Sequence, residues 1–347
     1  MNKGILLTDL HAGIRADSNI FLKSFENLFK DFLPEIIKKQ NVSNIFILGD
    51  IFDNRNHLNL KTINLVLSTF KEFLSSHPTL EVYILIGNHD LFYKNTREIN
   101  SLKILEDKFN NIHIISEVTR KKILNRDIVL CPWIIDKTDI TETFKEPADV
   151  CLGHFAINGF EMIQGFKETE GLSQSDFDSC FKLTFSGHFH LRNEIGRIIY
   201  IGTPYQLSWN DCGSTKGVYV LDFDTLNYDF IEYTSAPKFK KIYLSRVKNK
   251  TIDIKKEICN NFIRLILDDN IESEILDKLN YIISGLNPLS FEVVDEEKSF
   301  GEVIISENSS GPVEFLDEYI EVMSLNDNVE RDILKRKMNE LFRRVEI

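Results

Sequence analysis

Short apolar runs that end abruptly at a glycine, aspartate or histidine restrict most strongly how this chain of 347 residues can fold. Such runs, bounded by turn residues, are typical of strands covered on both faces. The nine runs are Ile5–Leu7, Ile45–Leu48, Val82–Ile86, Ile112–Ile115, Ile128–Leu130, Val150–Leu152, Leu183–Phe185, Ile198–Ile201 and Val218–Leu221. We therefore predict at least one mixed sheet between Ile5 and Phe223.

Two segments between the early runs carry apolar residues at helical spacing, and we interpret both as core-packing helices. One contains Phe21, Phe25, Leu28, Phe29, Phe32 and Ile36, and the other contains Ile63, Val66, Leu67, Phe70 and Leu74. Alternating strands and helices predict a layered α/β domain.

The bulk composition excludes several classes of protein. The formal charge of −12 argues against broad, non-specific nucleic-acid binding, but leaves room for a local basic strip. The five cysteines form no Cys-x-x-Cys pair, so neither a disulfide framework nor a thiolate zinc site is indicated. Without a signal-peptide pattern or an apolar stretch of roughly 20 residues, we expect a cytoplasmic protein without membrane association.

Five segments with metal-ligating residues follow five of the apolar runs. They are Asp9-Leu10-His11, Gly49-Asp50-Ile51-Phe52-Asp53, Gly87-Asn88-His89-Asp90, Gly153-His154 and Gly187-His188-Phe189-His190. Five of the eight histidines fall inside them. Because open α/β folds place their sites at the carboxyl ends of strands, we expect these residues to converge.

The residue types in these segments suit one chemistry. Carboxylate, imidazole and amide oxygen ligands without thiolate favour Mn, Fe or Zn, with Mn a good candidate. Two ions about 3.5–4 Å apart can clamp a phosphate and lower the pKa of a water. Asp50 is the natural carboxylate to bridge both ions.

In this order the segments resemble the calcineurin-like metallophosphoesterase superfamily, whose pattern is D-x-H, G-D-x-x-D, G-N-H-D/E, G-H and G-H-x-H. The resemblance implies a four-layer α/β/β/α sandwich. It implies one metal held by Asp9, His11, Asp50 and His190, and another held by Asp50, Asn88, His154 and His188.

The same resemblance implies three catalytic residues that are not metal ligands. His89 would contact the phosphate and assist the leaving group. Asp53 and Asp90 would lie behind the ligands, where carboxylates typically orient histidines. His57, outside the motifs, is read as structural or surface, with lining of the site as the alternative.

Three segments, two of them already described, resemble the SbcD-type DNA-repair nucleases and their phage counterpart. Asp9–Gly13 (DLHAG) is similar to their D-W-H-L-G, and Gly49–Asp53 (GDIFD) matches their G-D-I-F-D. Tyr200–Leu207 (YIGTPYQL) is similar to their Y-x-G-S/T-P-x-x-L. The departures at Leu10 and Ala12 affect packing and no ligand. The serine/threonine phosphatase branch fits poorly, because Asn54-Arg55 replaces its Arg-Gly.

We predict four parts: a phosphoesterase domain at 1–235, a small α+β capping domain at 236–294, a linker at 295–312 and a helix-turn-helix tail at 313–347. A basic strip at the start of the cap suggests contacts with DNA phosphates, although a strand edge guarded by lysines is the alternative. Its candidate residues are Lys238, Lys240, Lys241 and Arg246.

The tail carries apolar faces that could pack on their own domain or on a partner. The residues concerned are Phe315, Leu316, Tyr319, Ile320, Leu334, Met338 and Leu341. The family resemblance implies docking on an SbcC-like coiled-coil ATPase, and a homodimer through helices near 60–110.

Together these features predict a DNA exo/endonuclease subunit of an SbcCD-like recombination and repair complex, using two Mn²⁺ ions with Mg²⁺ as the alternative. A small-molecule phosphodiesterase or nucleotidase of the same fold is one alternative. A non-catalytic scaffold is another, although such proteins usually lose ligands and none is missing here.

Overall fold

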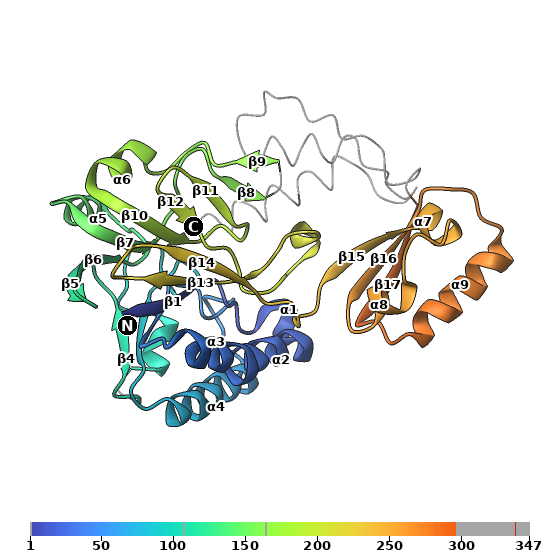
Figure 1. Cartoon of the computed structure of the whole chain (residues 1–347), viewed down its shortest axis with the longest axis horizontal. Coiled ribbons are helices and arrows are strands. Elements are labelled where there is room, and N and C mark those ends of the chain that lie inside the picture. Colours follow the sequence, from blue (N-terminus) through green and yellow to red (C-terminus); the bar gives the residue numbers. More distant parts are fainter. Residues whose placement is uncertain (1, 107, 164, 296–336, 338–347) are drawn as a thin grey trace. The chain divides into compact units, whose positions relative to one another are not determined.

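The computed structural model describes residues 2–106, 108–163, 165–295 and residue 337 (Figure 1). The chain forms two compact units, the first ending at Phe239 and the second beginning at Lys240. Nearly all of the predicted linker and tail, with the tail residues proposed to bind a partner, lie outside the described residues.

The first unit contains two six-stranded sheets. The first, ordered β14-β13-β1-β2-β3-β4, comprises β1 (Lys3–Leu7), β2 (Asn44–Ile47), β3 (Glu81–Leu85), β4 (Ile112–Ile115), β13 (Gly217–Asp222) and β14 (Tyr228–Glu232). The second, ordered β11-β12-β10-β7-β6-β5, comprises β5 (Thr119–Ile123), β6 (Arg126–Cys131), β7 (Ala148–His154), β10 (Phe181–Gly187), β11 (Asn193–Ile195) and β12 (Ile198–Tyr200). All nine predicted runs are strands of these sheets.

Both sheets are parallel at their centres. Strands β1 to β4 pair in parallel, and so do β6, β7, β10 and β12. The remaining pairs, which are β1 with β13, β13 with β14, β11 with β12 and β5 with β6, are antiparallel. Parallel central strands bring their carboxyl ends to one edge of each sheet, which is where the predicted site residues follow.

Helices cover the outer face of each sheet (Figure 1). On the first sheet lie α2 (Asn19–Asn27), a π-helical turn (Leu28–Phe32), α3 (Leu33–Gln40) and α4 (Leu60–Ser76). On the second lie α5 (Lys137–Thr143) and α6 (Gln174–Cys180). The predicted aromatic stripes pack together, with the Phe29 and Phe70 ring centroids 5.0 Å apart.

The remaining elements of this unit are short. They are α1 (Ile14–Asp17), a 3-10 turn (Ser101–Ile104), the hairpin β8 (Glu161–Ile163) and β9 (Phe166–Lys167), and a 3-10 turn (Trp209–Asp211). Within the described residues, no helix has the length and apolar character needed to cross a bilayer.

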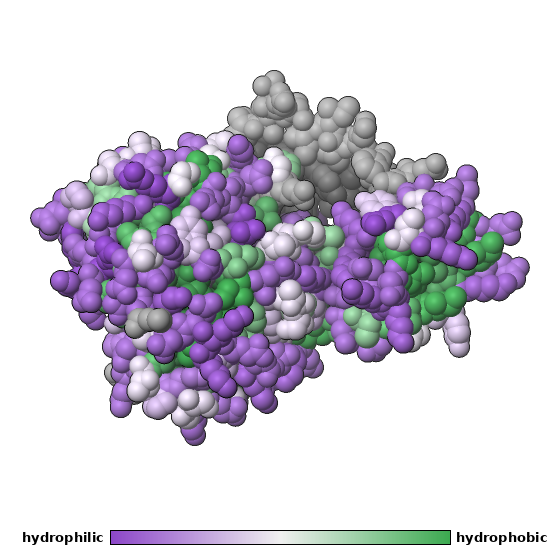
Figure 2. Space-filling view, in the orientation of Figure 1, coloured by the Kyte–Doolittle hydropathy of each residue, from purple (hydrophilic) through white to green (hydrophobic). Residues whose placement is uncertain are grey.

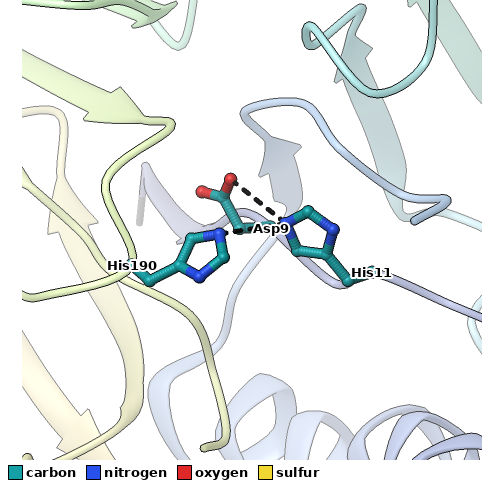
Figure 3. Close-up of side chains that lie close together, drawn as sticks. All are labelled: Asp9, His11 and His190. Carbon is teal, nitrogen blue, oxygen red and sulfur yellow. Dashed lines mark hydrogen bonds and ion pairs between the residues drawn. The ribbon is translucent and has the colours of Figure 1, made fainter. Parts of the chain in front are cut away.

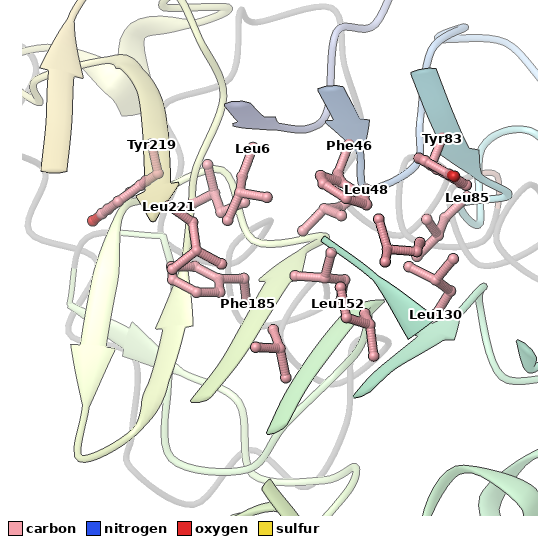
Figure 4. Packing of buried hydrophobic residues seen from close by; sticks show 14 of the residues in the cluster. Leu6, Phe46, Leu48, Tyr83, Leu85, Leu130, Leu152, Phe185, Tyr219 and Leu221 are labelled. Atoms are coloured by element: carbon pink, nitrogen blue, oxygen red, sulfur yellow. The ribbon is translucent and has the colours of Figure 1, made fainter. Parts of the chain in front are cut away.

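The main core lies between the two sheets (Figure 4). Leu6 and Phe46 from the first sheet meet Leu152 and Phe185 from the second, and all four are fully buried. Full burial of such a side chain contributes about 1.5–3 kcal/mol. The predicted α/β/β/α sandwich is therefore confirmed.

The second unit contains a three-stranded sheet ordered β15-β16-β17. Its elements are β15 (Phe239–Tyr243), α7 (Leu244–Lys248), α8 (Ile254–Ile258), β16 (Phe262–Leu267), α9 (Ser273–Gly285) and β17 (Ser290–Asp295). Figure 2 shows hydrophobic residues on the surface of this unit. Ile275 and Ile282 of α9 are 52% and 54% exposed.

The first unit extends past residue 235 to Phe239. The Phe239 ring is buried against Phe21 and Trp209, with centroid distances of 6.5 and 5.0 Å. This packing joins the segment to the first unit, although sequence composition changes earlier, after Tyr233.

Candidate active site

All ten residues predicted for catalysis or metal binding lie at the ends of five neighbouring strands. Asp9 and His11 follow β1, Asp50 and Asp53 follow β2, Asn88, His89 and Asp90 follow β3, His154 ends β7, and His188 and His190 follow β10. Since β1, β2 and β3 are adjacent, as are β7 and β10, the five segments can meet between the two sheets.

The first ligand group contains Asp9, His11 and His190 (Figure 3). His11 Nε2 lies 3.1 Å from His190 Nε2 and 3.8 Å from Asp9 Oδ1. Asp9 Oδ1 is buried and accepts no hydrogen bond from any described residue. Two imidazole nitrogens and an unpaired carboxylate oxygen that converge in this way fit a bound cation.

The second group is built around His154. Its Nδ1 donates a hydrogen bond of 2.6 Å to the Leu48 carbonyl, which leaves Nε2 as the ligating atom. That Nε2 lies 2.9 Å from Asn88 Oδ1 and 3.3 Å from Asp50 Oδ2. His188 Nδ1 lies 2.9 Å from the same Asn88 oxygen. These acceptor atoms likewise fit a cation.

Asp50 lies between the two groups. Its Oδ2 is 3.3 Å from His154 Nε2 in one group and 4.0 Å from His11 Nε2 in the other. The carboxylate therefore stands where a ligand shared by two ions would be needed. The donor set of both groups is oxygen and imidazole nitrogen, which suits Mn²⁺ or a similar divalent ion.

The charges of these groups also fit cation binding. Burial lowers the pKa of His188 to about 3 and that of His190 to about 4, so both rings are neutral at pH 7. Burial acts in the same direction on His11 and His154, but neighbouring carboxylates outweigh it and raise their pKa values to about 10 and about 9. The protons on the His11 and His154 rings neutralise the negative charge of the nearby carboxylates, and a bound metal ion could neutralise that charge instead.

Asp53 contacts two histidines of the site. Its Oδ1 lies 3.1 Å from His11 Nδ1, and its backbone carbonyl accepts a 2.7 Å hydrogen bond from His89 Nδ1. The His89 amide donates to Asp50 Oδ1 at 2.7 Å. Both contacts of Asp53 orient imidazole rings, which is the kind of role that the sequence suggested for it.

Asp90 is buried and binds backbone amides. Its Oδ2 accepts hydrogen bonds from the amides of Asp50 (2.9 Å) and Gly87 (3.0 Å). Its Oδ1 accepts from the Phe52 amide (3.4 Å) and the Ser101 hydroxyl (3.1 Å). Burial and the Asp50 charge raise the pKa of Asp90 to about 7, although the hydrogen bonds from these amides act to lower it. The side chain thus holds two ligand loops, whereas the sequence suggested that it orients a histidine.

Several candidate ligand residues have strained backbone. Asp9, His11, Asp50 and His188 have φ values of 53°, 44°, 55° and 88°. Each such residue costs about 1–3 kcal/mol and persists only where its surroundings enforce it. Here the loops after β1 and β2 bind each other, since the His11 amide donates to the Asp50 carbonyl at 3.1 Å. A Cβ on Gly87 would lie 2.1 Å from Asp50 Oδ1, so only glycine fits there.

Some residues beside the site had no clear signal in the sequence. The Trp133 ring lies against His188, with centroids 4.8 Å apart. Arg97 donates to the Trp133 carbonyl and pairs with Asp139 at 2.5 Å. A buried Lys216 donates to the His190 carbonyl at 2.6 Å. Arg97 and Lys216 belong to no recognisable motif, and only Trp133, directly after a strand-like run, could have been suspected.

The basic strip is partly neutralised. Lys238 pairs with Glu232 at 2.9 Å, and Lys240 pairs with Glu257 at 2.7 Å. Lys241 and Arg246 are exposed. The strip therefore offers less positive charge than its composition suggests.

Comparisons with known proteins identify the family of this chain. Residues 5–192 match the calcineurin-like phosphoesterase family, and the chain belongs to that family. It is 28% identical to exonuclease subunit 1 of Enterobacteria phage T4 over 345 residues, which is 97% of each chain. It is 23% identical to the SbcD component of nuclease SbcCD of Escherichia coli (strain K12) over 295 residues, covering 66% of this chain and 67% of that protein.

A solved archaeal phosphodiesterase is also similar, with 14% identity and a TM-score of 0.33, covering 66% of this chain and 99% of that one. Family membership makes this protein a phosphoesterase, and so a hydrolase. Among its described residues, three overlapping sets of carboxylates and imidazoles could hold a metal ion. They are Asp9, His11 and His190; His11, Asp53 and His89; and Asp9, Asp50 and His154.

Proposed function

We propose that this protein is a DNA nuclease subunit that hydrolyses phosphodiester bonds with two divalent metal ions, Mn²⁺ or alternatively Mg²⁺, in the cytoplasm. The convergence of seven potential ligands from five strand ends carries the proposal. They are Asp9, His11, Asp50, Asn88, His154, His188 and His190. Similarity to a phage exonuclease subunit along 97% of the chain supports DNA as substrate.

Each ligand group would hold one ion. Asp9, His11 and His190 would hold the first, Asn88, His154 and His188 would hold the second, and Asp50 would be shared. Bound ions would neutralise phosphate charge and activate the attacking water. The protein's part is to fix these side chains before substrate binds, which the strained loops and buried hydrogen bonds described above accomplish.

His89 is the proposed proton donor to the leaving oxygen. Its Nδ1 is engaged by the Asp53 carbonyl at 2.7 Å, so Nε2 is the atom left to meet substrate. Its ring centroid lies 4.9 Å from that of His11, which places it beside the first ligand group. In its protonated form, Nε2 would donate to the oxygen as the P–O bond breaks.

Lys241 and Arg246 are the exposed members of the basic strip and are proposed to contact DNA phosphates. Lys238 and Lys240 would contribute only if DNA replaced their glutamate partners. If charge reversal at Lys241 and Arg246 left the salt dependence of DNA binding unchanged, the strip would have no such role.

We also propose two protein partners. The tail residues named above would dock on an SbcC-like coiled-coil ATPase, as the similarity to the SbcD component of a nuclease named SbcCD suggests. The test is co-purification with such an ATPase, and failure to associate would contradict the proposal.

The second partner is another copy of this chain. Leu60, Phe92, Tyr93 and Ile99 are exposed by 76%, 41%, 50% and 54%, and lie in the region expected to form a homodimer. The Phe92 and Tyr93 rings also contact each other, with centroids 4.7 Å apart. Adjoining exposed apolar side chains are typical of interfaces. A monomeric mass in light scattering would contradict the dimer.

The deciding experiment is a nuclease assay of the purified chain on linear DNA with Mn²⁺ and then Mg²⁺, alongside His89→Ala. We expect metal-dependent cleavage that falls about 10²- to 10⁴-fold in the variant, because the leaving oxygen loses its proton donor.

His113→Ala is the matched control, since His113 pairs with Glu81 at the start of β3, the end of that strand opposite the site. It should cleave DNA at the wild-type rate. Turnover of a small phosphodiester without any cleavage of DNA would mean that the metal site serves another substrate, and would reject the nuclease proposal.

A further inference from the structure

Lys216 and Asp211 form a buried ion pair close to the proposed metal site. Lys216 is 5% exposed, Asp211 is 2% exposed, and Nζ lies 2.6 Å from Oδ1. Burial lowers the pKa of Lys216, and the Asp211 carboxylate opposes that shift. A buried pair gives little net stability, because desolvation of both charges offsets their attraction. The pair is therefore weak evidence for a stabilising role, and its contacts decide what else it does.

The Lys216 ammonium also contacts the backbone of His190. It donates to the His190 carbonyl at 2.6 Å, and the Thr203 amide donates to the same oxygen at 3.2 Å. His190 lies in the irregular segment after β10, where no sheet hydrogen bonds hold it. These two donors therefore determine where its backbone lies, and so how its ring meets His11.

Asp211 connects this contact to a rigid turn. Its Oδ2 accepts hydrogen bonds from the amides of Leu207 at 2.9 Å and Ser208 at 3.1 Å. It closes a reciprocal cap with Ser208 at the start of the turn Trp209–Asp211. Asp211 also neutralises the Lys216 charge, which would otherwise repel a metal cation nearby.

We propose that Lys216 is a positioning residue that sets the metal affinity of the group formed by Asp9, His11 and His190. The ammonium fixes the His190 carbonyl, and Asp211 fixes the ammonium. Neither side chain is one of the proposed metal ligands. This inference rests on the proposed metal site, and its test separates failure of the two.

Two variants of the full chain test the inference. Asp211→Asn combined with Lys216→Met removes both charges, so no unpaired charge remains buried. Lys216→Arg keeps the ion pair but alters the reach and geometry of the donor at the His190 carbonyl. Mn²⁺ binding is measured by calorimetry, and folding without metal is checked by circular dichroism. Lys182→Met is the control, because its ion pair with Asp149 lies on the surface of β10.

Wild type and the control should bind two Mn²⁺ ions. In both test variants we expect one site to weaken about 10- to 100-fold, as is usual when support behind a ligand is lost, while the other site keeps its affinity. Two unchanged sites in either folded variant would overturn the positioning role. An equal loss at both sites would do so too, since that indicates general loosening. Wild type that binds no Mn²⁺ would instead reject the metal site itself.

Discussion

Replacing Asp50 by alanine is expected to reduce turnover of a phosphodiester about 10³- to 10⁴-fold in the presence of Mn²⁺. The carboxylate lies 3.3 Å from His154 Nε2 and 4.0 Å from His11 Nε2, and it is the ligand that we propose both ions share. Its loss weakens both sites, and metal ions contribute several kcal/mol to the transition state, which corresponds to about this factor. Initial rates on a small aryl phosphodiester measure the effect without requiring DNA.

Asp127→Ala is the control for this experiment. Asp127 forms a part-exposed ion pair with Arg120 on β5 and β6, away from the strand ends that carry the ligands. Its loss should leave turnover within about twofold, since surface ion pairs contribute little. Full activity of Asp50→Ala would contradict the shared-ligand assignment.

The second large effect is on stability. Asp90→Ala should lower the free energy of unfolding by about 3–5 kcal/mol, because it leaves several buried donors without an acceptor. Three are backbone amides, those of Asp50, Gly87 and Phe52, and one is the Ser101 hydroxyl. Guanidinium unfolding without metal ions measures the loss separately from any effect on metal binding.

Ser101→Ala provides a graded comparison. It removes one of the four hydrogen bonds to Asp90 and leaves the three amide contacts, so a loss of about 1 kcal/mol is expected. If Asp90→Ala cost no more than Ser101→Ala, Asp90 would not be the support of the ligand loops.

The buried strands of the first unit could be predicted because their signal is local. Each is a short apolar run closed by turn residues, and the same burial that stabilises the strand selects its composition. The strands that sequence analysis did not single out lie at sheet edges. β5 (TRKKI) and β11 (NEI) are largely polar, and they are strands because a neighbour pairs with them, which no local pattern reports.

The candidate site residues could also be picked out in the sequence, since each chemically distinctive segment follows a strand. What those segments do not reveal is orientation. The Leu48 carbonyl engages Nδ1 of His154 and leaves Nε2 as the candidate ligand atom. Asp90 accepts hydrogen bonds from backbone amides, whereas a contact with a histidine was expected. Both depend on groups brought together from different strands, at separations in the chain that a motif does not span.

Order and spacing along the chain predicted the layered α/β domain and the five candidate ligand segments, and the family resemblance of those segments implied the sandwich and the phosphoester chemistry. Tertiary packing alone decided that Phe239 belongs to the first unit, that Lys238 and Lys240 are paired, and that Lys216 supports His190. The physical reason is the range of the forces involved. Hydrophobic periodicity is set by neighbours in sequence, whereas desolvation, ion pairing and ligand orientation depend on which distant groups share a buried space.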